Sequence, residues 1–147
     1  PIEGLQTEWL RENLLKRFDV PNKFASYHVP AYPSHRSFNN KDVERVRKHF
    51  VPVFEEGKLK AAFEHHDHLY KRTYPLLHDM PHRDGVLYMG DGAWGVDPRS
   101  PRKAWYLAEA IEDNHVILVT VEKDRTIYRA VNADGDTIDQ YVQPNQN

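Results

Sequence analysis

The sequence contains no cysteine among its 147 residues, which excludes disulfide bonds, cysteine zinc sites and thiol nucleophiles. It also lacks an excess of basic residues, since 20 Lys and Arg stand against 22 Asp and Glu. Nucleic-acid-binding proteins normally present a basic surface, so no such surface is expected. No stretch approaches the roughly 18 apolar residues of a membrane-spanning helix, and no membrane partner is expected either. The chain starts at Pro1 without a signal-like segment, as an internal fragment would.

What the sequence does contain is typical of a globular domain. Hydrophobic residues make up 39% of it, charged residues 29% and aromatic residues 12%. A chain of this length can bury a substantial core as one domain. We expect residues 1–142 to form a single domain and the polar residues 143–147 to form a loose tail.

A histidine cluster is the most distinctive local feature. His65, His66 and His68 follow a short apolar run that is predicted to be a strand. Alternate residues of a strand point to the same side, so His66 and His68 can reach one cleft. Neutral imidazole is the commonest metal-binding side chain near neutral pH, but a catalytic metal usually needs three protein ligands. Further ligands must therefore come from elsewhere.

Hydrophobic spacing predicts helices over Thr7–Phe18 and Val43–Phe54, with Thr7 and either Asn39 or Asn40 as N-caps. Pro52 predicts a kink or an early end of the second helix. Strands are predicted over the ranges Lys23–His28, Lys58–Phe63, Val86–Met89, His115–Glu122, Thr126–Val131 and Thr137–Tyr141. Lys103–Ala110 is predicted to be a short helical or irregular segment.

The order of these elements predicts a layered α/β fold that ends in an antiparallel β meander. Asp134-Gly135 is a strong hairpin signal within that meander. In layered α/β folds, ligands gather beyond the C-terminal ends of the strands. His28 and His66 each lie at such an end, which favours a shared site. The loop Val29–Phe38 between strand and helix is long enough to be functional.

Three motifs in this order resemble a known family. They are Gln6-Thr7-Glu8-Trp9-Leu10, then Tyr27-His28-Val29-Pro30, then the segment from Glu64 to Thr73. Together they resemble the C-terminal half of the calcineurin-like metallophosphoesterases, most closely the purple-acid-phosphatase-like branch. The resemblance implies half of a layered metallophosphoesterase sandwich. It also implies hydrolysis of phosphate mono- or diesters by a metal-activated hydroxide.

Carried over residue by residue, the resemblance makes His28 and His66 ligands of one metal ion and His68 a ligand of a second. The ions would be divalent or trivalent, with Fe, Zn and Mn all compatible with imidazole and carboxylate ligands. Asp67, Glu64 or backbone carbonyls would orient the second nitrogen of each imidazole. An exported or periplasmic location fits the family, while the sequence itself leaves the compartment open.

Further residues are candidates for contacts with substrate or with the metal ligands. They are His35, Arg36, His65, Asp67, Tyr70 and Arg72. Arg36 and His35 could meet a substrate phosphate, since Arg pairs well with phosphate oxygens. Tyr70 and Arg72 match family positions and are interpreted mainly as packing and hydrogen-bonding groups. Gly90, Asp91 and Gly92 are expected to let the backbone pass close to the site.

The chain departs from the family pattern in two ways. His65 stands where the family has a glycine, and the family's earlier metal and proton-donor motifs are absent. We therefore expect the chain alone to be inactive, with no metal necessarily bound, and the proton donor to lie in a missing N-terminal half. An apolar face left uncovered by that half would drive self-association. The alternative is a non-catalytic binding domain with a vestigial histidine cluster.

Overall fold

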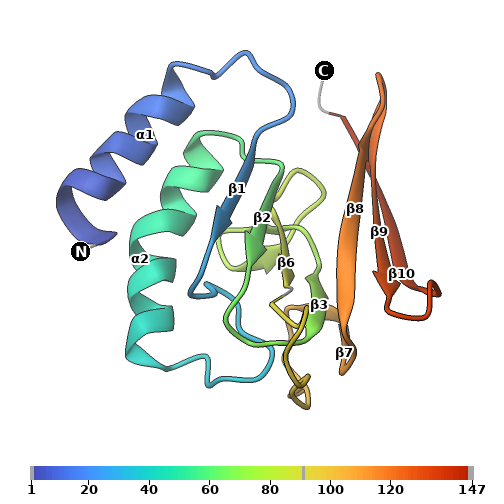
Figure 1. Ribbon diagram of the computed structural model, residues 1–147. Helices are drawn as coiled ribbons and strands as arrows, with labels where there is room; N and C mark the ends of the chain where they lie inside the picture. Colours follow the sequence, from blue (N-terminus) through green and yellow to red (C-terminus); the bar gives the residue numbers. More distant parts are fainter. Residues whose placement is uncertain (1, 91, 146–147) are drawn as a thin grey trace.

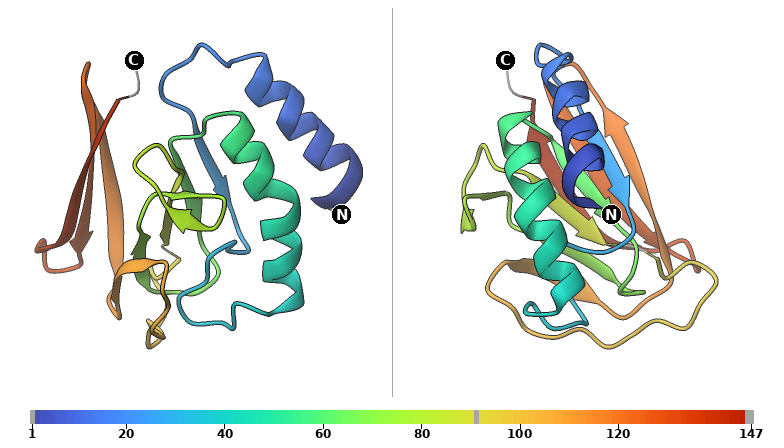
Figure 2. Two further views of the ribbon diagram at one scale, coloured as in Figure 1. Left: turned by 180° about the vertical axis from the view of Figure 1, so that it is seen from behind. Right: turned by 90° about the vertical axis from the view of Figure 1, so that its left-hand side faces the viewer.

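The computed structural model describes residues 2–90 and 92–145. A helical layer covers one face of a five-stranded sheet, and a three-stranded sheet lies on the other face (Figures 1 and 2). The expected α/β architecture that ends in an antiparallel meander is therefore confirmed.

Two α-helices follow a short irregular π-helical segment, Ile2–Gln6. Helix α1 spans Thr7–Leu15 and helix α2 spans Lys41–Glu56. The side chain of Asn40 caps α2 by accepting bonds from the amides of Asp42 and Val43. The predicted apolar stripe of α2 is buried, and it includes Val43, Val46, Phe50, Val53 and Phe54.

The predicted N-cap of α1 was wrong, and of the kink or early end predicted at Pro52 the early end does not occur. Thr7 is not the N-cap of α1, because Gln6 takes that position and the Thr7 hydroxyl bonds to the Ile2 carbonyl. Helix α2 also runs past Pro52 to Glu56. Proline removes the hydrogen bond to the carbonyl four residues earlier, here that of Lys48. Because Pro52 and Lys48 are both exposed, water can satisfy that carbonyl and the helix continues.

The central sheet has the strand order β1-β2-β6-β3-β7. Its strands are β1 (Phe24–Tyr27), β2 (Ala61–Glu64), β6 (Leu87–Gly90), β3 (Tyr70–Thr73) and β7 (Leu107–Ile111). Strands β1, β2 and β6 are parallel, whereas β3 is antiparallel to both β6 and β7. The carboxyl ends of the three parallel strands consequently meet at one edge of the sheet.

The central strands are buried on both faces, and alternate side chains enter different cores. Ala62 and Tyr88 pack toward the helices, in a cluster that contains Phe50 and Phe54 of α2. The opposite face of β2 and β6 packs on the three-stranded sheet, through residues that include Ala61, Leu87, Met89, Tyr128 and Ala130. The sheet is therefore a rigid support for residues at its edge.

The three-stranded sheet is the predicted meander, with the order β10-β9-β8. Its strands are β8 (His115–Val121), β9 (Arg125–Asn132) and β10 (Thr137–Pro144). Gly135 has a φ of +89° in the turn between β9 and β10, as the Asp134-Gly135 signal predicted.

Several strands differ from the sequence prediction. Residues 107–111 form β7 rather than a helical or irregular piece, because they pair with β3 and complete the sheet. Strand β3 and the short hairpin of β4 (Leu76–Leu77) and β5 (Met80–Pro81) were not predicted. The tail expected from residue 143 is not loose at its start, since Gln143 is buried and bonded to Tyr128.

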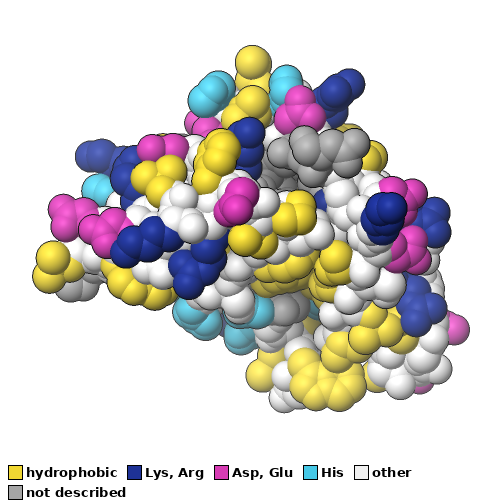
Figure 3. Space-filling view, turned by 90° about the horizontal axis from the view of Figure 1, so that it is seen from above, with side chains coloured by type: hydrophobic (Ala, Val, Ile, Leu, Met, Phe, Trp, Pro, Cys, Tyr) yellow, Lys and Arg dark blue, Asp and Glu magenta, His cyan; other side chains and the backbone are white. Residues whose placement is uncertain are grey.

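Exposed apolar side chains are frequent on this chain. On α1, Trp9 is 62% exposed although its spacing suggested packing, and only Leu14 of that helix is buried. Phe24 on the edge strand β1 is 39% exposed and Leu118 on the edge strand β8 is 44% exposed. Seen from above, hydrophobic side chains reach the surface between the helical side and the β8–β10 side (Figure 3).

Within residues 2–90 and 92–145, no helix combines the length and apolar character needed to cross a bilayer.

Candidate functional site

The histidine motifs lie side by side at the carboxyl edge of the central sheet. Strand β1 ends at Tyr27 and strand β2 at Glu64, and these two residues are partners in the parallel register. His28 and His65 are the next residues of the two strands, and the His65 amide donates to the His28 carbonyl over 3.1 Å. Residues 37 positions apart are thus brought together by strand pairing.

The imidazoles of His28 and His66 are in direct contact. His66 Nδ1 lies 2.7 Å from His28 Nε2, and the ring centroids are 4.5 Å apart at an interplanar angle of 65°. In a hydrogen bond between two neutral imidazoles, one nitrogen donates and the other accepts, so the two tautomers are coupled. The structure therefore brings together two of the three predicted metal ligands.

His68 completes the motif on a strained turn. Its φ is +55°, in the left-handed region that non-glycine residues seldom adopt. The carbonyl of His68 accepts a bond from the amide of Arg99 over 2.9 Å, which ties this turn to the loop after β6. Unfavourable backbone conformations of this kind concentrate at functional sites.

Burial lowers the pKa values of His65, His66 and His68 and so favours their neutral forms. Burial lowers the pKa of His66 below the ordinary 6.5, and the charge of Arg36 lowers it further. Burial also lowers the pKa of His68, with Arg99 and Arg36 acting in the same direction. The pKa of His65 is lowered by burial and by His28. Neutral imidazoles have the lone pair that a metal ligand requires.

The residues present fit part of a metal centre and not a complete one. Two imidazole nitrogens that share one tetrahedral ion lie about 3.3 Å apart, so the 2.7 Å contact would open by about 0.6 Å. Among residues 2–90 and 92–145, no group of three or more His, Asp or Glu side chains is placed to hold an ion. The donor chemistry suits a metal, but the number of donors is too small.

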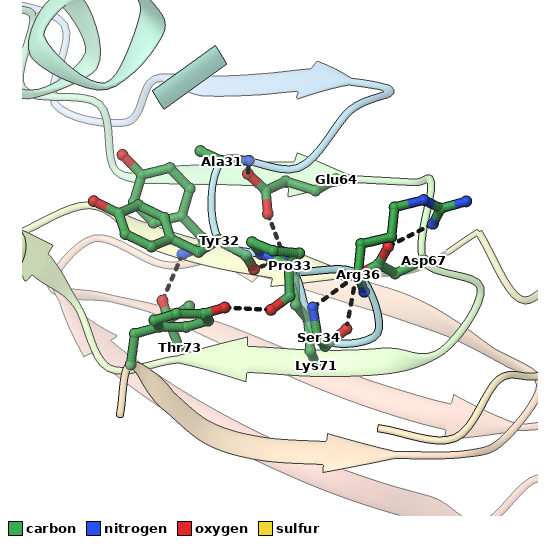
Figure 4. Close-up of polar contacts among 12 residues, drawn as sticks. Ala31, Tyr32, Pro33, Ser34, Arg36, Glu64, Asp67, Lys71 and Thr73 are labelled. Carbon is green, nitrogen blue, oxygen red and sulfur yellow. Dashed lines mark hydrogen bonds and ion pairs between the residues drawn. The ribbon is translucent and has the colours of Figure 1, made fainter. Parts of the chain in front are cut away.

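Asp67, which lies between His66 and His68, is buried and bonds to the loop before α2. Its Oδ2 accepts from the amides of Ser34 (2.7 Å) and His35 (2.8 Å), and its Oδ1 pairs with Arg36 at 2.6 Å (Figure 4). Burial acts to raise the pKa of Asp67, but the bonds from His35, Arg36 and Ser34, with the charge of Lys71, hold it at about 2. The carboxylate is therefore ionised throughout the neutral range.

Glu64, directly before the histidines, is bonded in a similar way. Its Oε1 accepts from the amide of Ala31 at 2.6 Å and from the hydroxyl of Tyr27 at 2.5 Å. Its Oε2 pairs with the buried Lys71. We predicted that Glu64 and Asp67 would orient imidazole nitrogens, but the bonds described above go to Tyr27, to Lys71 and to the loop that contains Arg36.

The other predicted site residues, His35, Arg36 and His65, bond to segments around the histidine pair. His35 Nδ1 lies 2.9 Å from the Ser100 carbonyl, and Arg36 donates to the His66 carbonyl over 2.7 Å. His65 Nε2 lies 2.8 Å from Ser26 Oγ on β1.

Tyr70 and Arg72 point toward the meander. The hydroxyl of Tyr70 and Nε of Arg72 both donate to Asp139 Oδ2 of β10 over 2.6 Å. This agrees with their interpretation as packing and hydrogen-bonding groups.

The glycine-rich turn after β6 lies against the histidine motif, as expected. A Cβ on Gly92 would overlap the carbonyl oxygen of His65, and the φ of Gly92 is +84°. Only glycine fits both conditions. Asp91, in the same turn, lies outside the described residues.

Arg99 is the residue that the sequence did not reveal. It lies 31 positions after His68, in a loop without a motif, yet its charge acts on both His66 and His68. Its charge lies near the imidazoles together with that of Arg36, which is paired with Asp67. Such a field attracts anions, among them phosphate esters.

Comparison with known proteins places the fold. No protein-family model matches the sequence, and no curated protein matches it significantly. Among solved structures, the purple acid phosphatase PPD1 from yellow lupin (Lupinus luteus) seeds aligns with a TM-score of 0.75 at 16% identity. GAP50, described as the anchor in the inner membrane complex of Plasmodium, aligns with a TM-score of 0.77 at 13% identity.

The two alignments cover 95% and 96% of this chain, but only 28% and 42% of the two solved chains. The chain thus spans less than half of either neighbour. At these identities the likeness shows the fold, and it confirms that the resemblance to purple acid phosphatases holds at the level of architecture.

Proposed function

With a purple-acid-phosphatase-like fold as the premise, we propose that this chain is the C-terminal part of a binuclear metallophosphoesterase. The observation that carries the proposal is the contact of His28 with His66 at the ends of two parallel strands. In layered α/β folds this edge is where ligands bind. The substrate class is phosphate mono- or diesters.

In this proposal the chain supplies imidazoles and positive charge. His28 and His66 are ligands of one ion and His68 is a ligand of the other. Two bound ions of Fe, Zn or Mn would generate a hydroxide and neutralise charge on the phosphoryl oxygens. Arg36 and Arg99 attract the phosphate ester toward the histidines, because both lie close enough to act on the pKa values of His66 and His68.

The remaining ligands and the proton donor come from a preceding half of the same domain. The donor set of this chain is too small by itself, and the solved neighbours are much longer chains. The exposed apolar residues of the edge strands β1 and β8 are where we place the contact with that half. The chain alone is therefore inactive as a phosphoesterase.

The test is the metal content of the full-length parent and its activity toward p-nitrophenyl phosphate and bis(p-nitrophenyl) phosphate. His66→Ala should remove metal and activity together. His82→Ala is the matched control, since His82 is an exposed histidine whose ring accepts a local bond from the Asp84 amide. A parent that hydrolyses both esters equally well with and without His66 would contradict the proposal.

A second candidate is a non-catalytic anchoring domain. It is favoured by the likeness to GAP50, an anchor, and by the small number of donors among the described residues. In that case the purified full-length parent would contain no stoichiometric transition metal, and His66→Ala would leave partner binding unchanged. The same metal analysis therefore separates the two functions.

A further inference from the structure

The loop between β1 and α2, residues 29–38, is fastened to the histidine motif by two carboxylates. Glu64 accepts from the amide of Ala31 and Asp67 accepts from the amides of Ser34 and His35 (Figure 4). The loop starts directly after His28, and the two carboxylates flank the His65-His66 pair in sequence. The bonds of each carboxylate therefore join the segment that contains His65 and His66 to the loop that follows His28.

Both carboxylates are buried, with 2% of Glu64 and 4% of Asp67 exposed. A buried carboxylate is tolerated only when its oxygens are fully bonded or paired. Movement of the loop would break the bonds of Asp67 to Ser34, His35 and Arg36 and the bond of Glu64 to Ala31, while Glu64 would keep Lys71. The loop is consequently held in one position with respect to the end of β2.

Lys71 strengthens the arrangement from β3, which β6 separates from β2 in the sheet. Its ammonium group pairs with Glu64 and also donates to the carbonyl of Tyr32, so it contacts β2 and the loop at once. The side chains of Lys71 and Glu64 are each only 1% exposed. Gly90 on β6 leaves room for the stem of Lys71, because a Cβ there would meet the Lys71 side chain.

We propose that Glu64 and Asp67 are positioning residues that hold the ring of His28 against the ring of His66. In the bonds described they touch neither ring, and they act through the loop that directly follows His28. The consequence for metal binding rests on the proposed function. The positioning itself does not, since it concerns two rings of this chain in the absence of metal.

The purely structural alternative is that the two carboxylates stabilise the fold without controlling the rings. Asp139 provides the matched control for that alternative. It is also a carboxylate that accepts several bonds, from Tyr70 and Arg72, but it links β3 to β10. Asp139→Asn should lower the urea midpoint of unfolding and leave the histidine pair intact.

The experiment compares Glu64→Gln, Asp67→Asn and Asp139→Asn in the metal-free chain at neutral pH. The readout is the NMR cross-peak between ring protons of His28 and His66, measured only under conditions where each variant is folded. The native chain should show the cross-peak, as expected from the 4.5 Å centroid distance. Glu64→Gln and Asp67→Asn should weaken or abolish it, and Asp139→Asn should not.

An unchanged cross-peak in both Glu64→Gln and Asp67→Asn would overturn the proposal. If Asp67→Asn does not fold, Arg36→Gln takes its place, because it removes the bonds to Asp67 and to the His66 carbonyl but keeps the carboxylate. An unchanged cross-peak in Arg36→Gln would then overturn the Asp67 part. Zn²⁺ titration of the full-length parent forms a separate arm, and its failure would contradict the proposed function alone.

Discussion

His66 Nδ1 lies 2.7 Å from His28 Nε2, although 38 residues separate them in sequence. The contact follows from the parallel pairing of β1 with β2 and from the loop that both carboxylates fasten.

The first prediction concerns acid stability and Asp67. Its pKa of about 2, against an ordinary 3.8, means that the folded state favours the ionised form. This stabilisation, about 2 kcal/mol, is fully present above the ordinary pKa and is lost as the pH falls through the folded value. Asp67→Asn should lower the free energy of unfolding by about that amount at neutral pH. It should also make that free energy depend less on pH in the acidic range.

Urea unfolding at several pH values measures this effect. Asp136→Asn is the control, since Asp136 is exposed in the turn between β9 and β10. Equal stability of Asp67→Asn and the native chain at neutral pH would contradict the prediction.

The second prediction concerns protonation of the histidines. The pKa values of His65, His66 and His68 are lowered by burial, so the unfolded state binds more protons than the folded state below the ordinary 6.5. Stability should therefore fall as the pH decreases from 6.5 toward their folded values. NMR titration of the ring protons checks the direction, and His82 serves as an exposed reference. Measured pKa values at or above 6.5 for His65, His66 and His68 would contradict the prediction.

The third prediction concerns Lys60, which precedes β2 and contacts Pro144 and Asn145 at the end of β10. Burial lowers its pKa to about 8 from an ordinary 10.5. The unfolded state then binds more protons between these values, so this residue makes stability rise with pH across that window. Lys60→Met should remove the rise, as measured by urea unfolding between pH 8 and the onset of tyrosine ionisation at about 10.

The fourth prediction concerns the glycine turn. Gly92→Ala places a Cβ against the His65 carbonyl at a φ of +84°, whereas Gly95→Ala at +77° meets open space. Both variants have an unfavourable backbone conformation, which costs of order 1–2 kcal/mol. Only Gly92→Ala should lose more stability than that backbone cost, and only Gly92→Ala should shift the ring resonances of the histidine motif. Similar melting temperatures for the two variants would show that the close approach is unimportant.

The fifth prediction concerns self-association of the chain by itself. Strand β8 is an edge strand whose seven residues, His115–Val121, include no Lys, Arg, Asp or Glu. Val116 and Leu118 are exposed on it, and such edges are templates for pairing between chains. Leu118→Lys should reduce concentration-dependent association in sedimentation velocity. Thr137→Lys on β10 is the control, and equal association of the two variants would argue against β8.

Much of the fold could be predicted from the sequence where local spacing reflects burial. The stripe of α2 was predicted because every third or fourth residue faces one core, and the meander because alternation and Asp134-Gly135 specify hairpins. Strand β7 was missed because its residues, Leu107–Ile111, have no strong alternation and become a strand by pairing with β3. The exposure of Trp9 was missed because spacing shows a stripe and not what covers it.

Some features of the candidate site could likewise be predicted from the sequence, and others only the structure showed. The sequence by itself determined that histidines follow two strands, and that a glycine turn follows a third. Only the tertiary structure decided that His28 and His66 touch, that Glu64 and Asp67 bond to the loop, and that Arg99 acts on the motif. The physical reason is that periodicity records which face of an element is buried. Contacts between distant segments depend instead on strand register and on loops held by buried hydrogen bonds, and local spacing encodes neither of them.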